Sequence, residues 1–359
     1  MMKKYIALKA IVVFIFLIPS GLIAQELYAG IEVGSKGVKM SVINVQNIKK
    51  GKYEVVDFWT ENIAIAKGIS IDGNLAANDI DTAFDVVVKN YTKLRKEFKI
   101  EEKKIFIVVS SGVGMAKNVD VLLQKLYVFT NVNVAIITSD TEAKLLLKGC
   151  IPPKEYTDSL ILDIGGGNTK GGYVEKFSED DILVFYPVTL DLGTVTFTEK
   201  INKKAKTNSI EEFNELLINA LPELREQTDR LYQQSPKIFN KDNIYMSGGA
   251  VWAFYTLYKG NAAIENFSPF EIKDVEAYNT LLKTDYAKFE TLASQNKDAE
   301  KVLKTYSQKY LIAANSILLT LLEQMPDAKS KKIYFTKQGQ MAWLLSYIAD
   351  SAKRAKNIQ

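Results

Sequence analysis

Apolar and polar positions alternate along the chain in two patterns from residue 27 onward. Short apolar stretches that end at glycine turns predict strands, and longer stretches with apolar residues at helical spacing predict helices. In the first half, the patterns predict a hairpin at 27–45, further strands at 52–65, 104–111 and 133–139, and helices at 80–98, 119–127 and 140–150.

The second half repeats this order of elements. The patterns predict a hairpin at 159–174, a strand at 181–193, helices at 195–204 and 210–234, a strand, turn and helix at 243–257, a helix at 311–324, a strand and turn at 331–339, and a helix at 341–354. Residues 265–301 are polar with interleaved aromatic residues, and we expect them to be helical or loop-like. The repeated order predicts an α/β fold with two domains, at 27–148 and 149–359, built on mixed sheets flanked by helices. The cleft between the domains is the expected ligand site.

The first residues carry a different pattern. Lys3, Lys4 and Lys9 precede an apolar stretch at 10–18, and small residues follow up to Ala24. This order is typical of a secretory signal peptide at 1–24, and it predicts a periplasmic or secreted protein. The alternative is an inner-membrane anchor, although roughly 14 apolar residues are short for a full span. Contact with a membrane is expected only through such an uncleaved segment.

The amino-acid composition limits which side chains could bind a ligand or catalyse a reaction. Among 359 residues there is one cysteine, Cys150, and no histidine. This excludes an intramolecular disulfide, a Cys/His zinc site and a nucleophile activated by histidine. The net charge of +4 is spread along the chain, so it predicts no nucleic acid partner. Carboxylates, hydroxyls, backbone amides or a hard cation must supply the chemistry.

The segment "LILDIGGGNTKGGYV" at 160–174 is the first candidate site. Three glycines at 165–167 follow Asp163 at the end of an apolar strand. Backbone N–H groups of such a turn can close on phosphate oxygens because no Cβ obstructs the approach. Asp163 is placed to hold Mg²⁺, and Thr169 to donate its hydroxyl. The alternative is an ordinary tight hairpin.

The first hairpin contains a counterpart. "GIEVGSKGVKM" places Glu32 two positions before a turn that contains Gly34, Ser35 and Gly37. Two such turns suggest two loops that grip one phosphate chain from both sides. The nearby lysines, Lys36, Lys39 and Lys170, are either solvated surface charges or groups that attract phosphate.

Further candidates lie where helices are predicted to begin. Ser139 and Glu142 fit a capping box, and the alternative is that Glu142 faces the cleft and polarises water. The glycine turns at 248–249 and 339 lie between a predicted strand and a predicted helix. They either point helix N-termini at an anion or are simply tight turns.

These motifs, in this order, resemble those of the exopolyphosphatase / guanosine pentaphosphatase (Ppx/GppA) family of the actin-like ATPase superfamily. The resemblance extends from about residue 27 to residue 346 and rests on "IEVGSKGVKM", "LILDIGGGNT", "SDTEAKLLLKG", "LDLGTVTFTEKI", "YLIAANSILLTLLEQM" and "KKIYFTKQGQMAWLL". It implies two ribonuclease-H-like domains that hold polyphosphate or a nucleotide polyphosphate between them. It also implies Mg²⁺ or another divalent cation, and a water molecule activated for in-line attack.

The resemblance also implies roles for individual residues. Glu142 and Glu32 are the expected catalytic residues, and Asp163 and Glu142 the expected metal ligands. The expected phosphate-binding residues are Gly34, Ser35, Lys36, Gly165, Gly166, Gly167, Asn168, Thr169, Gly248 and Gly249.

Four positions depart from the family pattern. Glu32 replaces an aspartate, and the longer side chain would move a ligand by roughly 1–1.5 Å. Lys170 replaces an acidic residue, Gly114 an arginine, and Thr141 the first of two glutamates. The first hypothesis is an exported phosphoanhydride hydrolase, and the second is a catalytically degenerate protein that binds polyphosphate or nucleotide without turnover. A kinase or ATPase of the wider superfamily is the third, and a homodimer stays open.

Overall fold

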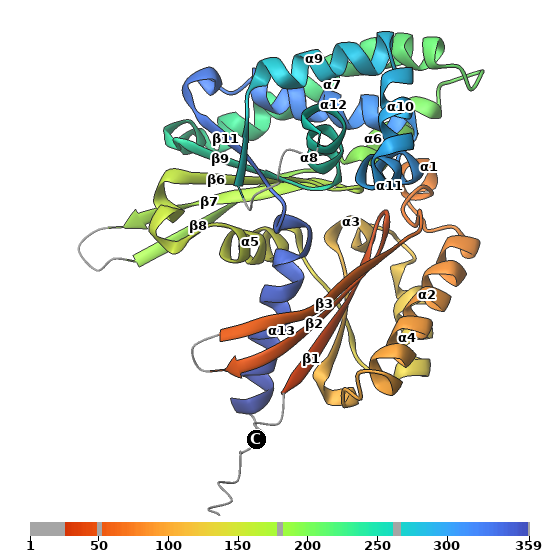
Figure 1. The fold of residues 1–359 in the computed structure, drawn as a ribbon, viewed down its shortest axis with the longest axis vertical. Coiled ribbons are helices and arrows are strands. Elements are labelled where there is room, and N and C mark those ends of the chain that lie inside the picture. The colour runs from red at the N-terminus through yellow and green to blue at the C-terminus, as the bar shows by residue number, and fades with distance from the viewer. Residues whose placement is uncertain (1–25, 49–51, 178–181, 261–266, 358–359) are drawn as a thin grey trace, which may run out of the picture.

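Figure 1 shows the computed structural model of the protein, which describes residues 26–48, 52–177, 182–260 and 267–357. The predicted signal peptide at 1–24 lies outside these residues. Within the described ranges, no helix combines the length and the apolar character that crossing a membrane requires.

The first lobe is built on a five-stranded sheet with the strand order β3-β2-β1-β4-β5. β1 pairs antiparallel with β2 and parallel with β4, so the sheet is mixed. The strands are β1 (Leu27–Gly34), β2 (Gly37–Asn47), β3 (Lys52–Asn62), β4 (Ile105–Val109) and β5 (Val134–Ile136), and the helices are α1 (Ile69–Asp72), α2 (Ala77–Lys96), α3 (Ser111–Gly114), α4 (Val119–Thr130) and α5 (Ser139–Cys150).

The second lobe is built on a six-stranded sheet with the order β10-β11-β9-β6-β7-β8. β6 pairs antiparallel with β7 and parallel with β9, just as β1 pairs with β2 and β4, so the duplicated order is confirmed. The strands are β6 (Ser159–Ile164), β7 (Thr169–Phe177), β8 (Ile182–Leu190), β9 (Asn243–Ser247), β10 (Phe267–Phe270) and β11 (Lys332–Thr336), and the helices are α6 (Thr194–Asn202), α7 (Ile210–Gln234), α8 (Gly249–Phe254), α9 (Ile272–Thr284), α10 (Ala287–Gln295), α11 (Lys297–Thr305), α12 (Gln308–Glu323) and α13 (Gly339–Asn357).

The central strand of each lobe is buried on both faces. Ile31 of β1 packs into the core that α2 and α4 cover, whereas its neighbour Gly30 faces α13. In the same way, Leu162 of β6 packs under the helices of the second lobe, and Ile161 packs on the side of α5. Because side chains alternate along a strand, Glu32 and Asp163 fall on the faces that look toward α5 and α13.

Two helices pack across the predicted domain boundary. α5 packs against β6, β7 and β8 of the second sheet, and α13 returns to pack against α5, β1 and β2 (Figure 1). The division at 148/149 stays a prediction, and these two helices give both lobes a shared apolar core.

The polar stretch at 265–301 is mainly helical, forming α9, α10 and most of α11, but it begins with a strand that the pattern did not predict. β10 pairs antiparallel with β11 at the edge of the sheet. It has four residues and contains Pro269, which an edge strand tolerates because one side needs no ladder hydrogen bond. Four residues are too few to show a period-two pattern.

Candidate functional site

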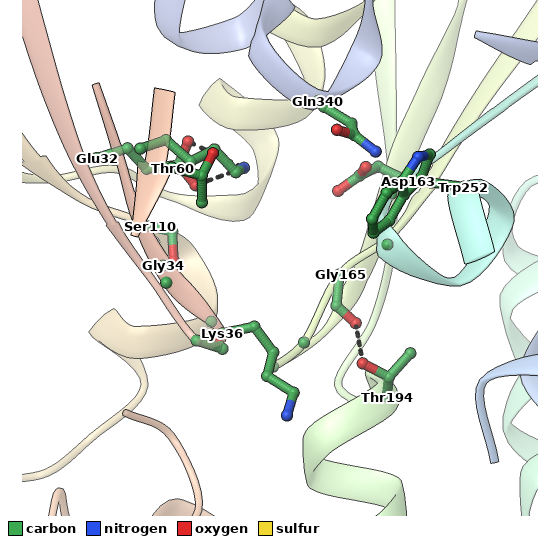
Figure 2. A pocket seen from close by; sticks show the side chains of 18 of the residues that line it. Glu32, Gly34, Lys36, Thr60, Ser110, Asp163, Gly165, Thr194, Trp252 and Gln340 are labelled. Atoms are coloured by element: carbon green, nitrogen blue, oxygen red, sulfur yellow. Dashed lines mark hydrogen bonds and ion pairs between the residues drawn. The ribbon is translucent and has the colours of Figure 1, made fainter. Parts of the chain in front are cut away.

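A cleft between the lobes is bordered by the turns of the two glycine hairpins. In Figure 2, Glu32 and Lys36 lie on one side of it, and Asp163 and Trp252 lie on the other. Of the residues that the sequence analysis singled out, those that line the cleft are Glu32, Gly34, Ser35, Lys36, Gly37, Lys39, Glu142, Asp163, Gly165, Gly166, Gly167, Asn168, Lys170, Gly248, Gly249 and Gly339. The cleft therefore brings together residues from both halves of the chain, as the duplicated motifs indicated.

The two lobes touch through backbone at the base of the cleft. A Cβ on Gly167 would lie 2.6 Å from the Cα of Gly112, in the segment after β4. A Cβ on Gly166 would lie 2.8 Å from the Cβ of Ser35, in the turn of the first hairpin. Glycine is required at these positions because any side chain would push the turns apart.

The second glycine turn is held by the start of α6. The backbone N–H of Thr194 donates to the carbonyl of Gly165 at 2.9 Å, and that of Val195 donates to the carbonyl of Gly166 at 2.8 Å. The N–H and C=O of a trans peptide point in opposite directions. The N–H groups of Gly166 and Gly167 therefore point away from α6, which is the orientation a phosphate cradle needs.

Each hairpin carries an acidic residue opposite a lysine. Glu32 is in register with Lys39, and the Lys39 ammonium lies 3.1 Å from Glu32 Oε1 and 3.2 Å from Oε2. Burial raises the pKa of the Glu32 carboxyl above its ordinary value, although the Lys39 charge acts in the opposite direction. Glu32 thus faces the cleft as half of an ion pair.

The second hairpin repeats this arrangement with a third partner. Asp163 is in register with Lys170, whose Nζ lies 3.1 Å from Asp163 Oδ2 and 2.8 Å from Glu142 Oε1. The side chain of Lys170 is only 6% exposed. Burial alone would lower the pKa of Lys170, but the charges of Glu142 and Asp163 outweigh it and hold that pKa above its ordinary value. The interpretation of Lys170 as a solvated surface charge is therefore wrong.

Glu142 faces the cleft and does not cap its own helix. The cap of α5 is Thr138, whose hydroxyl accepts from the backbone N–H of Thr141. Glu142 Oε2 instead accepts from the backbone N–H and the hydroxyl of Ser111, at 3.1 and 2.7 Å. The capping-box alternative with Ser139 is therefore wrong, because the Glu142 side chain crosses to α3.

Two side chains that were predicted to bind phosphate instead form hydrogen bonds within the protein. Asn168 is buried; its amide donates to the hydroxyls of Ser111 and Ser139, and its carbonyl accepts from Lys170 at 3.4 Å. Thr169 lies outside the lining of the cleft, and its hydroxyl donates to the carbonyl of Leu192. Because neighbouring residues of a strand face opposite sides, Thr169 points away when Lys170 points toward the cleft.

Lys36 extends from the tip of the first hairpin into the cleft. Its ammonium lies 4.1 Å from the ring centroid of Tyr310 and 5.7 Å from that of Tyr306. Burial, together with the nearby charge of Lys67, lowers the pKa of Lys36 to about 8. An ammonium of this kind is poised to gain a phosphate partner.

The sequence did not point to several other residues of the cleft. Ser110, Trp252, Lys301 and Tyr306 line it, and Ser111 supports Glu142 from behind. Ser110 could have been found, because it directly follows a buried strand whose carboxyl end meets the cleft. Lys301 comes from α11, in a polar stretch whose pattern gave no hint of its position.

The implied divalent metal does not fit between its predicted ligands. The Lys170 ammonium already contacts one oxygen of Asp163 and one of Glu142, which is the position that a bridging cation would take. Among the residues that the structure describes, no group of three or more acidic, histidine or cysteine side chains is arranged to hold a metal ion. A divalent metal therefore stays a prediction from the family resemblance.

Comparison with known proteins places this geometry in a family. The model of the Ppx/GppA phosphatase family matches residues 44–239, more than half of the chain. The chain belongs to the Ppx/GppA phosphatase family. It is 23% identical over 177 residues to the guanosine-5'-triphosphate,3'-diphosphate pyrophosphatase of Pseudoalteromonas atlantica, a match that covers 49% of this chain and 33% of that protein.

Solved structures of the family share the fold. This family member matches the Ppx/GppA protein of Aquifex aeolicus with a TM-score of 0.62 at 18% identity, over 93% of this chain and 99% of that one. It matches an exopolyphosphatase from Cytophaga hutchinsonii with a TM-score of 0.65 at 14% identity, over 89% and 98%. The predicted fold class is confirmed. The match to two curated relatives, a bifunctional 3-dehydroquinate synthase/phosphatase and the Pseudoalteromonas atlantica pyrophosphatase, spans only 28% and 33% of their lengths.

Proposed function

We propose that this chain is a phosphoanhydride hydrolase that releases phosphate from polyphosphate or from a nucleotide polyphosphate. The observation that carries the proposal is the cleft in which two glycine turns meet beside the buried carboxylate of Glu142. Membership of the Ppx/GppA phosphatase family and similarity to guanosine-5'-triphosphate,3'-diphosphate pyrophosphatases support the same class of reaction.

The residues of the cleft suggest how the reaction would proceed. The N–H groups of Gly166 and Gly167 hold a terminal phosphate, and Lys36 and Lys301 offset its charge. Glu142 accepts a proton from water as the water oxygen bonds to phosphorus and the anhydride P–O bond breaks. Phosphoryl transfer needs positioning and charge stabilisation more than covalent chemistry, so these groups are of the appropriate kind.

Export belongs to this proposal as well. The order of basic, apolar and small residues at 1–24 supports removal of a signal peptide and action outside the cytoplasm. The mass of the chain recovered from a periplasmic fraction tests this, because a chain retained at full length in the cytoplasm would contradict it.

Phosphate release by the Glu142→Gln variant tests the hydrolase proposal. We expect release from polyphosphate to fall by about 100-fold or more, the usual contribution of a general base. Glu175→Gln is the matched control, because Glu175 also pairs with a buried lysine, Lys241, but does not line the cleft. Equal loss in both variants, or no loss in Glu142→Gln, would contradict the role of Glu142.

One observation favours the second hypothesis, a protein that binds without turnover. Both oxygens of Glu142 are occupied, one by Lys170 and the other by Ser111, so a water molecule must compete for them. Calorimetric titration with triphosphate beside the release assay separates the two functions. Tight binding with no release by the wild-type chain would favour the binding protein.

A further inference from the structure

We propose that Lys170 is a built-in cation, supplying between Glu142 and Asp163 the positive charge that the family implies a divalent metal supplies. The inference rests on the proposed function in one respect: the bound group is a phosphoanhydride. Its consequence is that the cleft binds that group without a divalent metal.

The position of Lys170 is fixed by the hairpin. It lies directly opposite Asp163 in the β6–β7 register, so the two side chains share one face of the sheet. The same face looks toward α5, which brings Glu142 to the ammonium from a different segment of the chain. The Nζ–O distance of 2.8 Å to Glu142 is that of a charge-assisted hydrogen bond, and the 3.1 Å to Asp163 lies within the ordinary N–H···O range. A metal ion at this point would have to displace the ammonium and break both ion pairs.

The ammonium keeps capacity for a ligand. A lysine has three N–H donors, and two of them are directed at Glu142 and Asp163. The third is directed at the Asn168 carbonyl at 3.4 Å, a long contact that a phosphate oxygen can replace. A Cβ on Gly165 would lie 3.3 Å from the Lys170 Nζ, so the ammonium lies directly beside the glycine turn. One ammonium thus pairs with both carboxylates, offsetting one of their two negative charges, and lies beside the predicted phosphate position.

The first hairpin contributes an equivalent ion pair to the other side of the cleft. Lys39 neutralises Glu32 across the β1–β2 hairpin, at the position equivalent to Lys170 in the second lobe. Among the described residues that line the cleft, three carboxylates are therefore balanced by four lysines: Glu32, Glu142 and Asp163 against Lys36, Lys39, Lys170 and Lys301. This lining is net positive without any bound metal and is suited to an anion.

Manganese binding, measured by electron paramagnetic resonance, tests the inference without using activity. The full chain is titrated with Mn²⁺ as wild type, as Lys170→Gln and as the control Lys241→Gln, which removes another buried, ion-paired lysine that does not line the cleft. We expect Lys170→Gln to bind Mn²⁺ at least about tenfold more tightly than wild type, because the ammonium that occupies the cation position is removed and both carboxylates become free to bind the ion. Lys241→Gln should match wild type. Equal Mn²⁺ affinity of Lys170→Gln and wild type would overturn the inference.

A second measurement needs no variant. Titration of the wild-type chain with triphosphate is compared in EDTA and in excess Mg²⁺, and we expect affinities within about twofold of each other, since Lys170 is present in both. Binding that requires Mg²⁺ would overturn the inference. If triphosphate binds under neither condition, the proposed function fails, and the manganese comparison still decides whether Lys170 occupies the cation position.

Discussion

The chemical character of the cleft depends on where each lysine finds its partner. Lys39 and Lys170 each face an acidic residue across a hairpin, at distances of about 3.1 Å. Lys36, at the turn itself, contacts aromatic rings of the other lobe. The charges of Glu142 and Asp163 hold the pKa of Lys170 above its ordinary value, whereas burial lowers the pKa of Lys36. The charge of Lys36 is therefore sensitive to pH near 8.

We expect triphosphate binding to weaken as the pH rises through 8. The pKa of Lys36 is lowered to about 8, so its ammonium is present below that pH and is lost above it. If the neutral amine does not bind phosphate, affinity at pH 9 should be about tenfold lower than at pH 7. Titration calorimetry at several pH values measures this.

The Lys36→Arg variant is the control for that pH dependence. A guanidinium stays charged throughout this range, so the affinity of the variant should change little between pH 7 and 9. A similar decline in Lys36→Arg and wild type would show that another group is responsible.

At the level of elements, the site is made by two hairpins whose turns touch. Gly167 and Gly112 approach so closely that no side chain fits between them, and α6 holds the second turn through its first N–H groups. The strands set which side chains face the cleft, and the turns set how closely the two lobes meet. Phosphate binding should therefore depend on the shape of this contact as well as on its charges.

Gly167→Ala tests this dependence. The added Cβ would lie 2.6 Å from Gly112, so we expect a loss of about 1–3 kcal/mol in the free energy of unfolding, together with weaker triphosphate binding. Gly260→Ala is the control: Gly260 has a φ of +69° and nothing within 4 Å of an added Cβ, so its substitution should cost stability but leave binding unchanged. Unchanged binding by Gly167→Ala would contradict the importance of the contact.

For the whole molecule, α5 and α13 join the lobes through apolar packing. Ile348 of α13 is fully buried and lies over Gly30 of β1, where an added Cβ would lie 2.7 Å from the Ile348 side chain. The last helix of the chain therefore closes on the first strand. A cleft whose two walls come from different lobes needs such a fixed base, because small displacements would separate the turns.

Ile348→Ala should lower the free energy of unfolding by about 2–5 kcal/mol, the usual cost of deleting a buried isoleucine side chain. Ile218→Ala provides the comparison, because Ile218 of α7 is 64% exposed and its truncation should change stability by no more than about 0.5 kcal/mol. Denaturant unfolding of both variants measures the difference. Equal effects would contradict the account of α13 as part of the shared core.

The sequence alone determined the fold class, the duplicated order of elements and the two glycine turns. These follow from local patterns, since the period of apolar residues and the position of glycines reflect neighbouring residues only. The resemblance of the motifs identified the family, which the match over residues 44–239 confirms. The strand β10 was not predicted because its four residues are too few to show the alternating pattern of a strand.

Only the tertiary structure decided what the charged residues do. The sequence left Glu142 either capping its helix or facing the cleft, and the contact with Ser111 on another element settles which. The sequence showed that Lys170 departs from the family pattern. The ion pair between Lys170 and Glu142, however, joins β7 to α5 and depends on how these two elements pack. Ion pairs of this kind are set by the distance between segments that are separate in the chain, and local pattern does not encode that distance. The sequence therefore determined where phosphate is expected, and the folded chain determined which cation stands beside it.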